Sequence, residues 1–349
     1  MMPGGRRKII KLAALIVLLL VVFFLDIALG PVRIPLKAVC KIMLSFPGQD
    51  SSWQYIVGQI RIPKAITAVI AGCGLSVSGL QIQTLFRNPL AESSVLGITA
   101  GASLGVAAIM LAGGGIATLY TIRELGISGS WLITLAGCLG AAAVMVIVVL
   151  VSKTINNNVM MLIVGVMIGT ITLSIINIWQ YFSDPELIKD YLLWTFGSLG
   201  GVTGIQLYIL SIVTVLGLVI SFLSSKMLDA LLLGENYARS MGVTPQRARF
   251  TIICSTSLLA GSITAFCGPI GFIGIAVPQM ARSLFSTSNH RVLIPGCCLI
   301  GTVLMLICDV IGQLPGSQTV LPINIITALI GAPTVIWIIL SKKNTSIYG

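Results

Sequence analysis

A series of long apolar runs constrains the fold of this chain more than any other feature of its sequence. A helix of about 20 apolar residues crosses the hydrocarbon core of a membrane, where every backbone N–H and C=O group must be bonded within the protein. The sequence therefore predicts an all-α integral membrane protein, with residues 1–349 forming a single domain of ten spans. We place these spans at residues 9–29, 66–86, 95–112, 131–151, 159–181, 205–223, 250–267, 270–284, 292–311 and 323–340.

The first and the eighth of these runs are the least regular. The first, Ile9 to Leu29, is longer than the apolar part of a usual signal peptide, and no A-x-A pattern follows it. We expect it to be retained as a span. The eighth run is short, and GPIGFIG (Gly268 to Gly274) leads into it. This sequence predicts a tight re-entry whose backbone groups are buried in protein.

Composition agrees with a membrane protein and excludes several other classes. The chain is 56% hydrophobic with a mean hydropathy of +1.04, which leaves too little polar surface for a soluble globule. Its formal net charge is +11, but the basic residues stand between the apolar runs, where they orient a chain in a membrane. No basic stripe with interleaved aromatic residues occurs, so we do not expect nucleic-acid binding.

The distribution of the 21 Lys and Arg residues predicts the orientation. With ten spans, both chain ends lie on one face of the membrane. Fourteen basic residues belong to the face of the termini and seven to the opposite face, which places both termini in the cytoplasm. The fourteen are Arg6, Arg7, Lys8, Lys11, Arg87, Lys153, Lys226, Arg239, Arg247, Arg249, Arg282, Arg291, Lys342 and Lys343; the seven are Arg33, Lys37, Lys41, Arg61, Lys64, Arg123 and Lys189.

Small residues recur at helical spacing around the second and third predicted spans. Gly97, Gly101 and Gly105 are four residues apart, and AGCGLSVSGLQ (71–81) repeats the pattern. Such stripes let two membrane helices approach closely, and ordinary helix packing explains them. The stretch RNPLAES (87–93) between the two runs has the Asn and Pro of a turn. We expect it to form a cytoplasmic corner between the second and third spans.

Cysteine and histidine give little sign of chemistry. All cysteines except Cys40 fall within apolar runs, so they are expected to be core residues and not a disulfide framework. The one histidine, His290, stands beside Arg291 between two runs and is expected to be solvated. Neither H-E-x-x-H nor G-x-x-x-x-G-K-[ST] occurs. The sequence predicts no enzyme, no bound metal or cofactor, and no nucleotide hydrolysis by this chain.

Few ionisable residues fall within the spans, although an ion-coupled transporter usually needs some at mid-membrane. Asp26 and Asp309 stand towards span ends, and Glu92 belongs to the predicted corner. Neutral polar residues do occur within the runs. They either line a path or bond across helices, and both interpretations stay open. These residues are Gln81, Gln83, Asn177 and Gln180.

The longest polar cytoplasmic segment runs from Ser224 to Phe250. Its leucines give a short amphipathic pattern that is broken at Gly242 and restarted after Thr244 and Pro245, a good cap and first-turn pair. Two short helices joined by a glycine would form a docking site for a partner protein. The alternative is a helical linker lying on the membrane face.

Four motifs together resemble the FecCD-type permease subunits of type II ABC importers, which carry iron siderophores, haem or cobalamin. The resemblance covers the chain from about Arg61 to Leu340, and the motifs stand in the family's order. They are the segment 61–105 from RIPKAITAV to GASLG, LLLGENYARSMGV (231–243), GPIGFIGIAVPQMARSL (268–284) and LPINIITALIGAPTVIWIIL (321–340).

This resemblance implies a ten-helix permease that works as a homodimer in the cytoplasmic membrane, surrounded by lipid. Two ATPase subunits would bind ATP and Mg²⁺ beneath it, and an extracytoplasmic substrate-binding protein would dock above. It implies that cytoplasmic helices at about 226–249 couple to the ATPase through Leu233, Gly234, Glu235, Ala238, Met241 and Gly242.

The resemblance also implies where a substrate would pass. The fifth helix and the loop before it would close and line the path. The implied gate residues are Asn156, Asn157, Asn158, Val159 and Met160, and the implied lining residues are Met167, Thr170, Ser174 and Asn177. Docking of the binding protein would involve Arg61, Lys64 and position 313.

Three residues depart from the family pattern. Gln279 replaces a usual histidine, Gln313 a usual arginine, and Val320 a usual glutamate before Leu-Pro. Gln313 cannot act as a docking cation. The leading hypothesis is ATP-driven import of a metal chelate by alternating access, with a ferric siderophore ahead of haem or cobalamin. An ion-coupled secondary transporter and a membrane scaffold without transport are the rivals from other classes.

Overall fold

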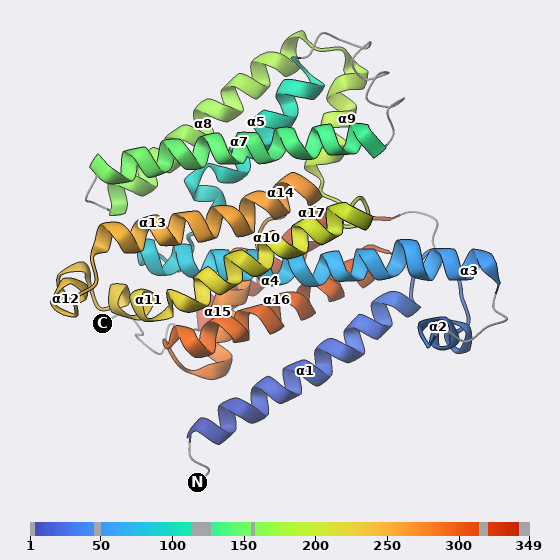
Figure 1. The fold of residues 1–349 in the computed structure, drawn as a ribbon, viewed down its shortest axis with the longest axis horizontal. Coiled ribbons are helices and arrows are strands. Elements are labelled where there is room, and N and C mark those ends of the chain that lie inside the picture. The colour runs from blue at the N-terminus through green and yellow to red at the C-terminus, as the bar shows by residue number, and fades with distance from the viewer. Residues whose placement is uncertain (1–3, 45–49, 113–126, 155–157, 314–319, 342–349) are drawn as a thin grey trace.

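The computed structural model describes residues 4–44, 50–112, 127–154, 158–313 and 320–341, and its regular elements are all helices (Figure 1). From the N-terminus to the corner after the second long span, these are α1 (Gly4–Ala28), α2 (Leu36–Met43), α3 (Ser51–Tyr55), a π-helical stretch η1 (Ile56–Arg61) and α4 (Ile62–Phe86). The middle of the chain contains a 3₁₀ turn η2 (Ser93–Leu96), α5 (Ile98–Met110), α7 (Ile127–Thr154), α8 (Asn158–Phe182), α9 (Pro185–Thr195) and α10 (Gly204–Leu223).

The remaining helices form the second half of the bundle. They are α11 (Ser225–Leu232), α12 (Glu235–Ser240), α13 (Pro245–Thr256), a π-helical stretch η3 (Ser257–Gly261), α14 (Ser262–Cys267), α15 (Ile273–Phe285), α16 (His290–Gly312) and α17 (Ile323–Ser341). Within the described residues, seven helical stretches are long and apolar enough to cross a membrane: Arg7–Ala28, Ser51–Phe86, Trp131–Ser152, Val159–Phe182, Gly204–Leu223, Pro245–Cys267 and His290–Gly312.

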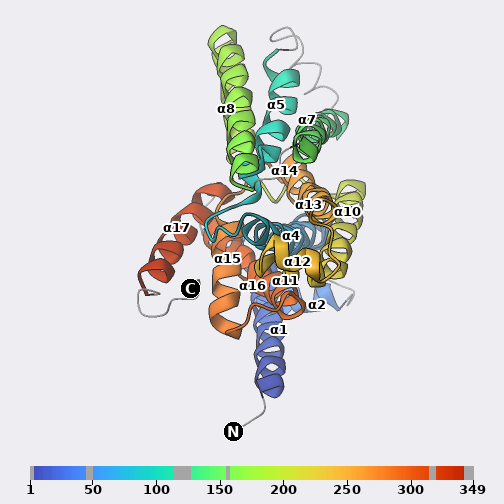
Figure 2. The ribbon, with the colours of Figure 1, turned by 90° about the vertical axis from the view of Figure 1, so that its left-hand side faces the viewer.

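Helix α4 lies at the centre of the bundle, with α16 and α15 on one side and α10 and α13 on another (Figures 1 and 2). Small residues make this possible because a Cβ atom at Gly72 would lie 2.7 Å from the carbonyl carbon of Gly301 in α16. The Ser76 hydroxyl also donates to the carbonyl of Cys297, at 2.8 Å. The two backbones therefore touch along the pair α4–α16.

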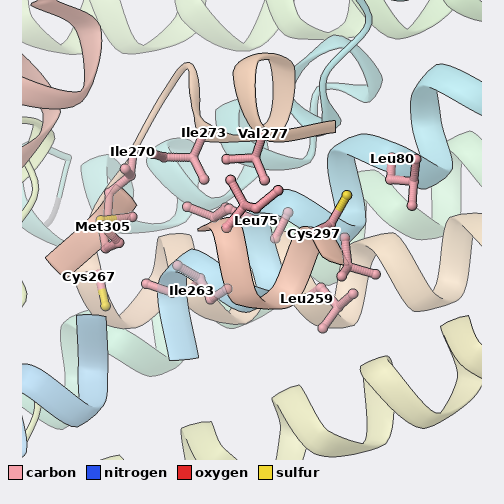
Figure 3. Packing of buried hydrophobic residues seen from close by; sticks show 14 of the residues in the cluster. Leu75, Leu80, Leu259, Ile263, Cys267, Ile270, Ile273, Val277, Cys297 and Met305 are labelled. Carbon is pink, nitrogen blue, oxygen red and sulfur yellow. The ribbon is translucent and has the colours of Figure 1, made fainter. Parts of the chain in front are cut away.

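The apolar core forms around this central helix. Figure 3 shows Leu75 of α4 among Val277 of α15, Cys297 of α16 and Ile263 of α14, all part of one buried cluster. Leu75 is 5% exposed and the other three are 0% exposed, so four helices distant in sequence share one interior.

The glycine stripe of the third predicted span packs α5 against α7, with one exception. A Cβ atom at Gly101 would lie 2.6 Å from the carbonyl oxygen of Gly140, and one at Gly105 would meet the backbone of Ala136. Gly97 does not belong to that stripe. Its φ of +75° is left-handed, which ends the preceding turn and makes Gly97 the residue before α5. The predicted helix therefore starts three residues later than we expected.

Helices α5 and α15 are both too short to cross a bilayer. Each has 13 residues, which corresponds to about 20 Å of helix against a hydrocarbon core of about 30 Å. The re-entry before α15 turns at Gly268 and Phe272, whose φ values are +76° and +69°. As the GPIGFIG sequence predicts, backbone groups at this turn are bonded to protein, for example the N–H of Gly271 to the Asn324 side chain at 3.0 Å.

The two ends of the bundle carry different short helices. In Figure 1, α11 and α12 lie at the left-hand end, where α1 also begins, and α2 and α3 lie at the right-hand end. The prediction of an all-helical membrane bundle is confirmed. The division of residues 1–349 into one domain with ten spans remains a prediction.

Candidate functional site

The predicted coupling residues lie in α12 and in the turns on either side of it. We call residues 225–249, which comprise α11, α12 and the start of α13, the coupling segment. Leu228, Leu231 and Ala238 are buried against the bundle. Leu233 and Met241 point outward, with 65% and 59% of their surface exposed, and Tyr237 is exposed between them. The coupling segment thus presents an apolar tip at one end of the bundle, a surface that suits a protein partner.

Two arginine side chains stabilise the coupling segment, one by an ion pair within it and one by hydrogen bonds from the end of α4. The guanidinium of Arg249, 2% exposed, forms an ion pair with Glu235. Arg87, which ends α4 with a φ of +50°, donates to the carbonyl of Leu231 at 3.1 Å. Gly234, with a φ of +118°, allows this approach, since a Cβ atom there would lie 3.2 Å from Nη2 of Arg87.

Gly242 terminates α12 in a Schellman motif. Its N–H donates to the carbonyl of Arg239 at 3.0 Å, and the N–H of Val243 donates to that of Ala238 at 2.9 Å. The φ of Gly242 is +80°, and nothing lies within 4 Å of a Cβ atom built there. Backbone conformation is therefore what requires glycine at this position.

His290 was expected to be solvated, and this prediction is wrong. The side chain is fully buried at the start of α16. Its Nδ1 lies 2.6 Å from Oδ1 of Asp229 in α11, and its Nε2 lies 2.8 Å from the hydroxyl of Thr84 in α4. Burial alone would raise the pKa of Asp229, but its hydrogen bonds to the side chain and backbone of His290 outweigh burial and hold that pKa below its usual value.

The corner after α4 is held by a second set of polar contacts. Oε1 of Gln83 accepts from Arg282 at 2.6 Å, and Gln279 donates to the carbonyl of Pro89 at 2.9 Å. The departure from the family pattern at position 279 therefore leaves a side chain that binds the corner. Gln83 also donates to the carbonyl of Gly274 at 3.2 Å.

Glu92 joins the same corner to the start of α15. Its carboxyl accepts from the backbone N–H groups of Phe272 and Gly274, which are donors that the first turn of a helix leaves free. Burial nevertheless raises the pKa of Glu92 to about 7. A helix N-terminus normally favours the carboxylate, so desolvation is the larger effect here.

Replacing Glu92 by glutamine is expected to remove a pH dependence of stability. Because the folded-state pKa is about 7 and the ordinary value is 4.5, folding favours the protonated acid. That contribution is fully present below pH 4.5 and is lost as the pH rises through 7. Thermal unfolding midpoints in detergent between pH 5 and pH 8 should fall for the wild type and change less for Glu92→Gln. Parallel curves for the two proteins would contradict this assignment.

Two of the four neutral polar residues predicted within the spans bond across helices. Gln81 donates to the hydroxyl of Ser255 at 3.2 Å and accepts from that of Thr256, so it bonds across helices, as Gln83 does. Asn177 instead lies exposed on α8, and Gln180 is partly exposed.

The predicted path-lining residues share one outward face of α8. Met167, Thr170, Ser174 and Asn177 recur at intervals of three and four residues, and all are exposed. Val159 and Met160 are exposed at the start of the same helix. Of the other predicted gate residues, Asn158 begins α8, and Asn156 and Asn157 lie outside the described residues.

The residues predicted to dock a binding protein lie instead in a buried polar cluster. Nε2 of Gln313 lies 2.9 Å from both Asp26 Oδ1 and Asp309 Oδ2, and Lys64 pairs with Asp309 at 2.9 Å. Arg61 is 6% exposed and donates to the carbonyls of Ile27, Ala28 and Val32. The polar groups of Arg61 and Gln313 are therefore already bound inside this chain, and a role for these residues in docking remains a prediction. Lys64 is 16% exposed.

Sequence reasoning missed the partners that connect these clusters. Asp229 and Arg249 carry charges in a segment where solvated charges are ordinary, and nothing in their spacing indicates burial. Asp26 and Asp309 did carry a signal, since acids within apolar runs are costly and tend to be paired. Their pairing with residues 64 and 313 depends on three separate helices and cannot be read from spacing.

Three comparisons with known proteins agree with this architecture. The model of the FecCD transport family matches residues 18–341. The vitamin B12 import system permease protein BtuC of Klebsiella pneumoniae subsp. pneumoniae is 32% identical over 341 residues, covering 97% of this chain and 96% of the relative. BtuC of Citrobacter koseri is 32% identical over 340 residues, with the same coverage.

A solved structure is similar in fold as well. It is described as an inward-facing conformation of a metal-chelate type ABC transporter, and it superimposes with a TM-score of 0.80 at 26% identity. The match covers 95% of this chain and 99% of that one. The similarity therefore extends over nearly the whole of both chains. The chain belongs to the FecCD transport family and is a membrane-spanning permease subunit of a type II ABC importer, which leaves ATP hydrolysis to a partner subunit.

Proposed function

We propose that this permease imports a metal chelate by alternating access, working as a homodimer, with a ferric siderophore as the first candidate cargo. The observation that carries the proposal is the outward face of α8. It combines methionine with neutral hydrogen-bonding groups at Thr170, Ser174 and Asn177, and all of these are exposed. A path between two such faces would accommodate a large chelate without binding it tightly, because it offers few directed contacts.

Cobalamin is the second candidate, and haem is the third. The relatives named above are vitamin B12 permeases, and their names favour a corrinoid. All these cargoes are metal chelates too large for a narrow ion path. Because the chain belongs to the FecCD transport family, we drop the two rival hypotheses, an ion-coupled secondary transporter and a membrane scaffold without transport.

The proposed assembly has a second copy of this chain, two ATPase subunits and an extracytoplasmic binding protein. The ATPases, carrying ATP and Mg²⁺, would contact the coupling segment at Leu233, Tyr237 and Met241. Both termini would then be cytoplasmic, in keeping with α1 beginning at the end of the bundle where α11 and α12 lie (Figure 1). The stretch 156–160 would form the cytoplasmic gate. ATP binding shifts the two access states only through different contacts with the ATPase in each.

Uptake by the complete complex in proteoliposomes tests the proposed cargo. The complex, purified with its ATPase and binding protein, is supplied with radiolabelled cyanocobalamin, an iron-loaded hydroxamate siderophore or haem. ATP-dependent accumulation of the siderophore is expected, with competition by unlabelled siderophore and not by cobalamin. Accumulation of cobalamin alone would move the assignment to the second candidate. Failure to accumulate all three would contradict the proposal.

Replacing Gly242 by valine is expected to uncouple ATP hydrolysis from uptake. A β-branched residue at a φ of +80° costs about 1–2 kcal/mol and would distort the turn after α12. The matched control is Gly242→Asn, because asparagine tolerates the left-handed conformation. Uptake per ATP hydrolysed should fall for valine and stay near the wild-type value for asparagine. Equal ratios for both variants would show that the turn has no role in coupling.

A further inference from the structure

Three buried or half-buried side chains connect the coupling segment to two membrane helices. Asp229 lies in α11, His290 begins α16, and Thr84 lies near the end of α4. Oδ1 of Asp229 is 2.6 Å from Nδ1 of His290, and Nε2 of His290 is 2.8 Å from the Thr84 hydroxyl oxygen. We call this series the Asp229–His290–Thr84 chain.

The hydrogen positions in this chain are restricted by its partners. Oδ1 of Asp229 also accepts from the backbone N–H of His290, at 2.9 Å. An ionised carboxylate can only accept, so the hydrogen bond between Asp229 and His290 is donated by Nδ1, which carries a proton. The single Thr84 proton has two possible acceptors, Nε2 and the carbonyl of Leu80 at 2.8 Å. With a neutral imidazole, Thr84 donates to Nε2. With an imidazolium, Nε2 donates to Thr84, which then donates to Leu80. Both arrangements keep the series continuous.

The surroundings exclude a hydrolytic role for this Thr-His-Asp series. Thr84 and His290 are both fully buried, so no substrate reaches the hydroxyl. The neighbouring charges are Arg282 of α15 and Arg291 of α16. Only Asp229 reaches solvent, with 35% of its side chain exposed. The geometry is suited to holding helices in place.

The Asp229–His290–Thr84 chain also lies where two membrane helices, α4 and α16, are in direct contact. Helices α4 and α16 are in backbone contact at Gly72 and Gly301, and Ser76 bonds to the carbonyl of Cys297. Among the hydrogen bonds that the structure describes, α11 is also attached to the C-terminal end of α4 by two bonds from the Arg87 guanidinium to the carbonyl of Leu231. A movement of α11 therefore reaches α4 and α16 together through His290.

We propose that the Asp229–His290–Thr84 chain transmits movement of the coupling segment to the α4–α16 pair, with His290 as the positioning residue. The inference rests on the proposed coupling role of residues 225–249 and goes beyond it by naming the link inside the permease. Loss of either hydrogen bond lets α11 move without the membrane helices, so ATP hydrolysis continues to occur without proportionate uptake.

Matched variants separate the hydrogen bonds from packing. Thr84→Val removes the hydroxyl at nearly constant volume, and Thr84→Ser keeps it. Asp229→Leu removes the acceptor, and Asp229→Asn keeps an acceptor oxygen. Asp184→Asn is the control, because Asp184 precedes α9 and its side chain makes no capping hydrogen bond to that helix. For each, uptake per ATP hydrolysed is measured with the complete complex in proteoliposomes, using the chelate that the wild type accumulates.

Uptake per ATP is expected to fall about tenfold for Thr84→Val and Asp229→Leu, in keeping with the loss of a buried or charged hydrogen bond. Thr84→Ser and Asp184→Asn should stay near the wild type. Unchanged ratios for Thr84→Val and Asp229→Leu would overturn the proposal, as would equal losses for Thr84→Val and Thr84→Ser.

A second measurement separates this inference from the proposed function. Amide hydrogen exchange of residues 225–232 in the purified complex is compared between Thr84→Val and Thr84→Ser. Faster exchange in α11 for the valine variant alone would support the link, and equal exchange would overturn it. If the wild type accumulates no chelate, the proposed function fails, and the exchange result still decides whether α4 holds α11 through His290.

Discussion

Replacing Gly79 by alanine is expected to lower the free energy of unfolding by about 3 kcal/mol. A Cβ atom at this position of α4 would overlap the backbone of Gly274 in α15, with the Cα of Gly274 only 2.5 Å away. Overpacking usually costs about 1–3 kcal/mol, and the upper end applies because backbone atoms cannot rotate aside. A loss of stability would be informative, because in an exposed helix replacing glycine by alanine raises the stability by roughly 0.5–1 kcal/mol.

The control for this substitution is Gly58→Ala. Nothing lies within 4 Å of a Cβ atom at Gly58, so alanine should leave the stability unchanged or slightly raised. Unfolding midpoints in detergent, together with the yield of monodisperse protein, compare the two variants. A Gly79→Ala protein as stable as Gly58→Ala would show that α4 and α15 do not pack in backbone contact.

Replacing Lys64 by methionine is expected to be the most damaging single change of a charge. Lys64 pairs with Asp309 at 2.9 Å, and Asp26 is bridged to that carboxyl through Gln313. Removing the cation leaves two buried acids with an amide between them. Breaking a buried ion pair costs about 3–5 kcal/mol because the remaining charge has no partner.

A second substitution, combined with Lys64→Met, tests whether the unpaired charge causes the loss of stability. Lys64→Met combined with Asp309→Asn should recover most of the lost stability, and Lys37→Met, at an exposed position of α2, should change it by less than about 0.5 kcal/mol. Denaturant or steric-trap measurements on the wild type, Lys64→Met, Asp309→Asn and the double variant give the coupling energy, with Lys37→Met measured beside them. Additive losses from the two substitutions at 64 and 309 would contradict a direct pairing.

The helical bundle could be predicted because each long span is a local property of the sequence. An apolar run of about 20 residues has few alternatives in a membrane, and the runs at α1, α7, α8, α10 and α16 overlap the helices that the structure describes. Helix starts were less predictable. Gly97 reads as one more member of a small-residue stripe, and only its left-handed backbone shows that α5 begins after it.

The candidate site was predictable where it depends on backbone conformation. Gly242 could be recognised as the break between two short helices because it interrupts an amphipathic pattern, and the structure has a left-handed turn there. Side-chain environments were not predictable. His290 and Gln313 look like surface residues between runs, yet both are buried by helices far away in the sequence. Their partners, Asp229 and Asp26, lie 61 and 287 positions away.

The shortness of α5 and α15 has a consequence for how this protein is made. Long spans such as α16 can enter the bilayer independently as they leave the ribosome, because each bonds its own backbone and is apolar throughout. A 13-residue helix that starts inside the bundle cannot do so. Helix α15 needs the Glu92 carboxyl at its first turn, and that residue is synthesised about 180 positions earlier. Its integration must therefore wait for docking onto the already inserted first half, so membrane insertion and tertiary folding form a single late step for this part of the chain.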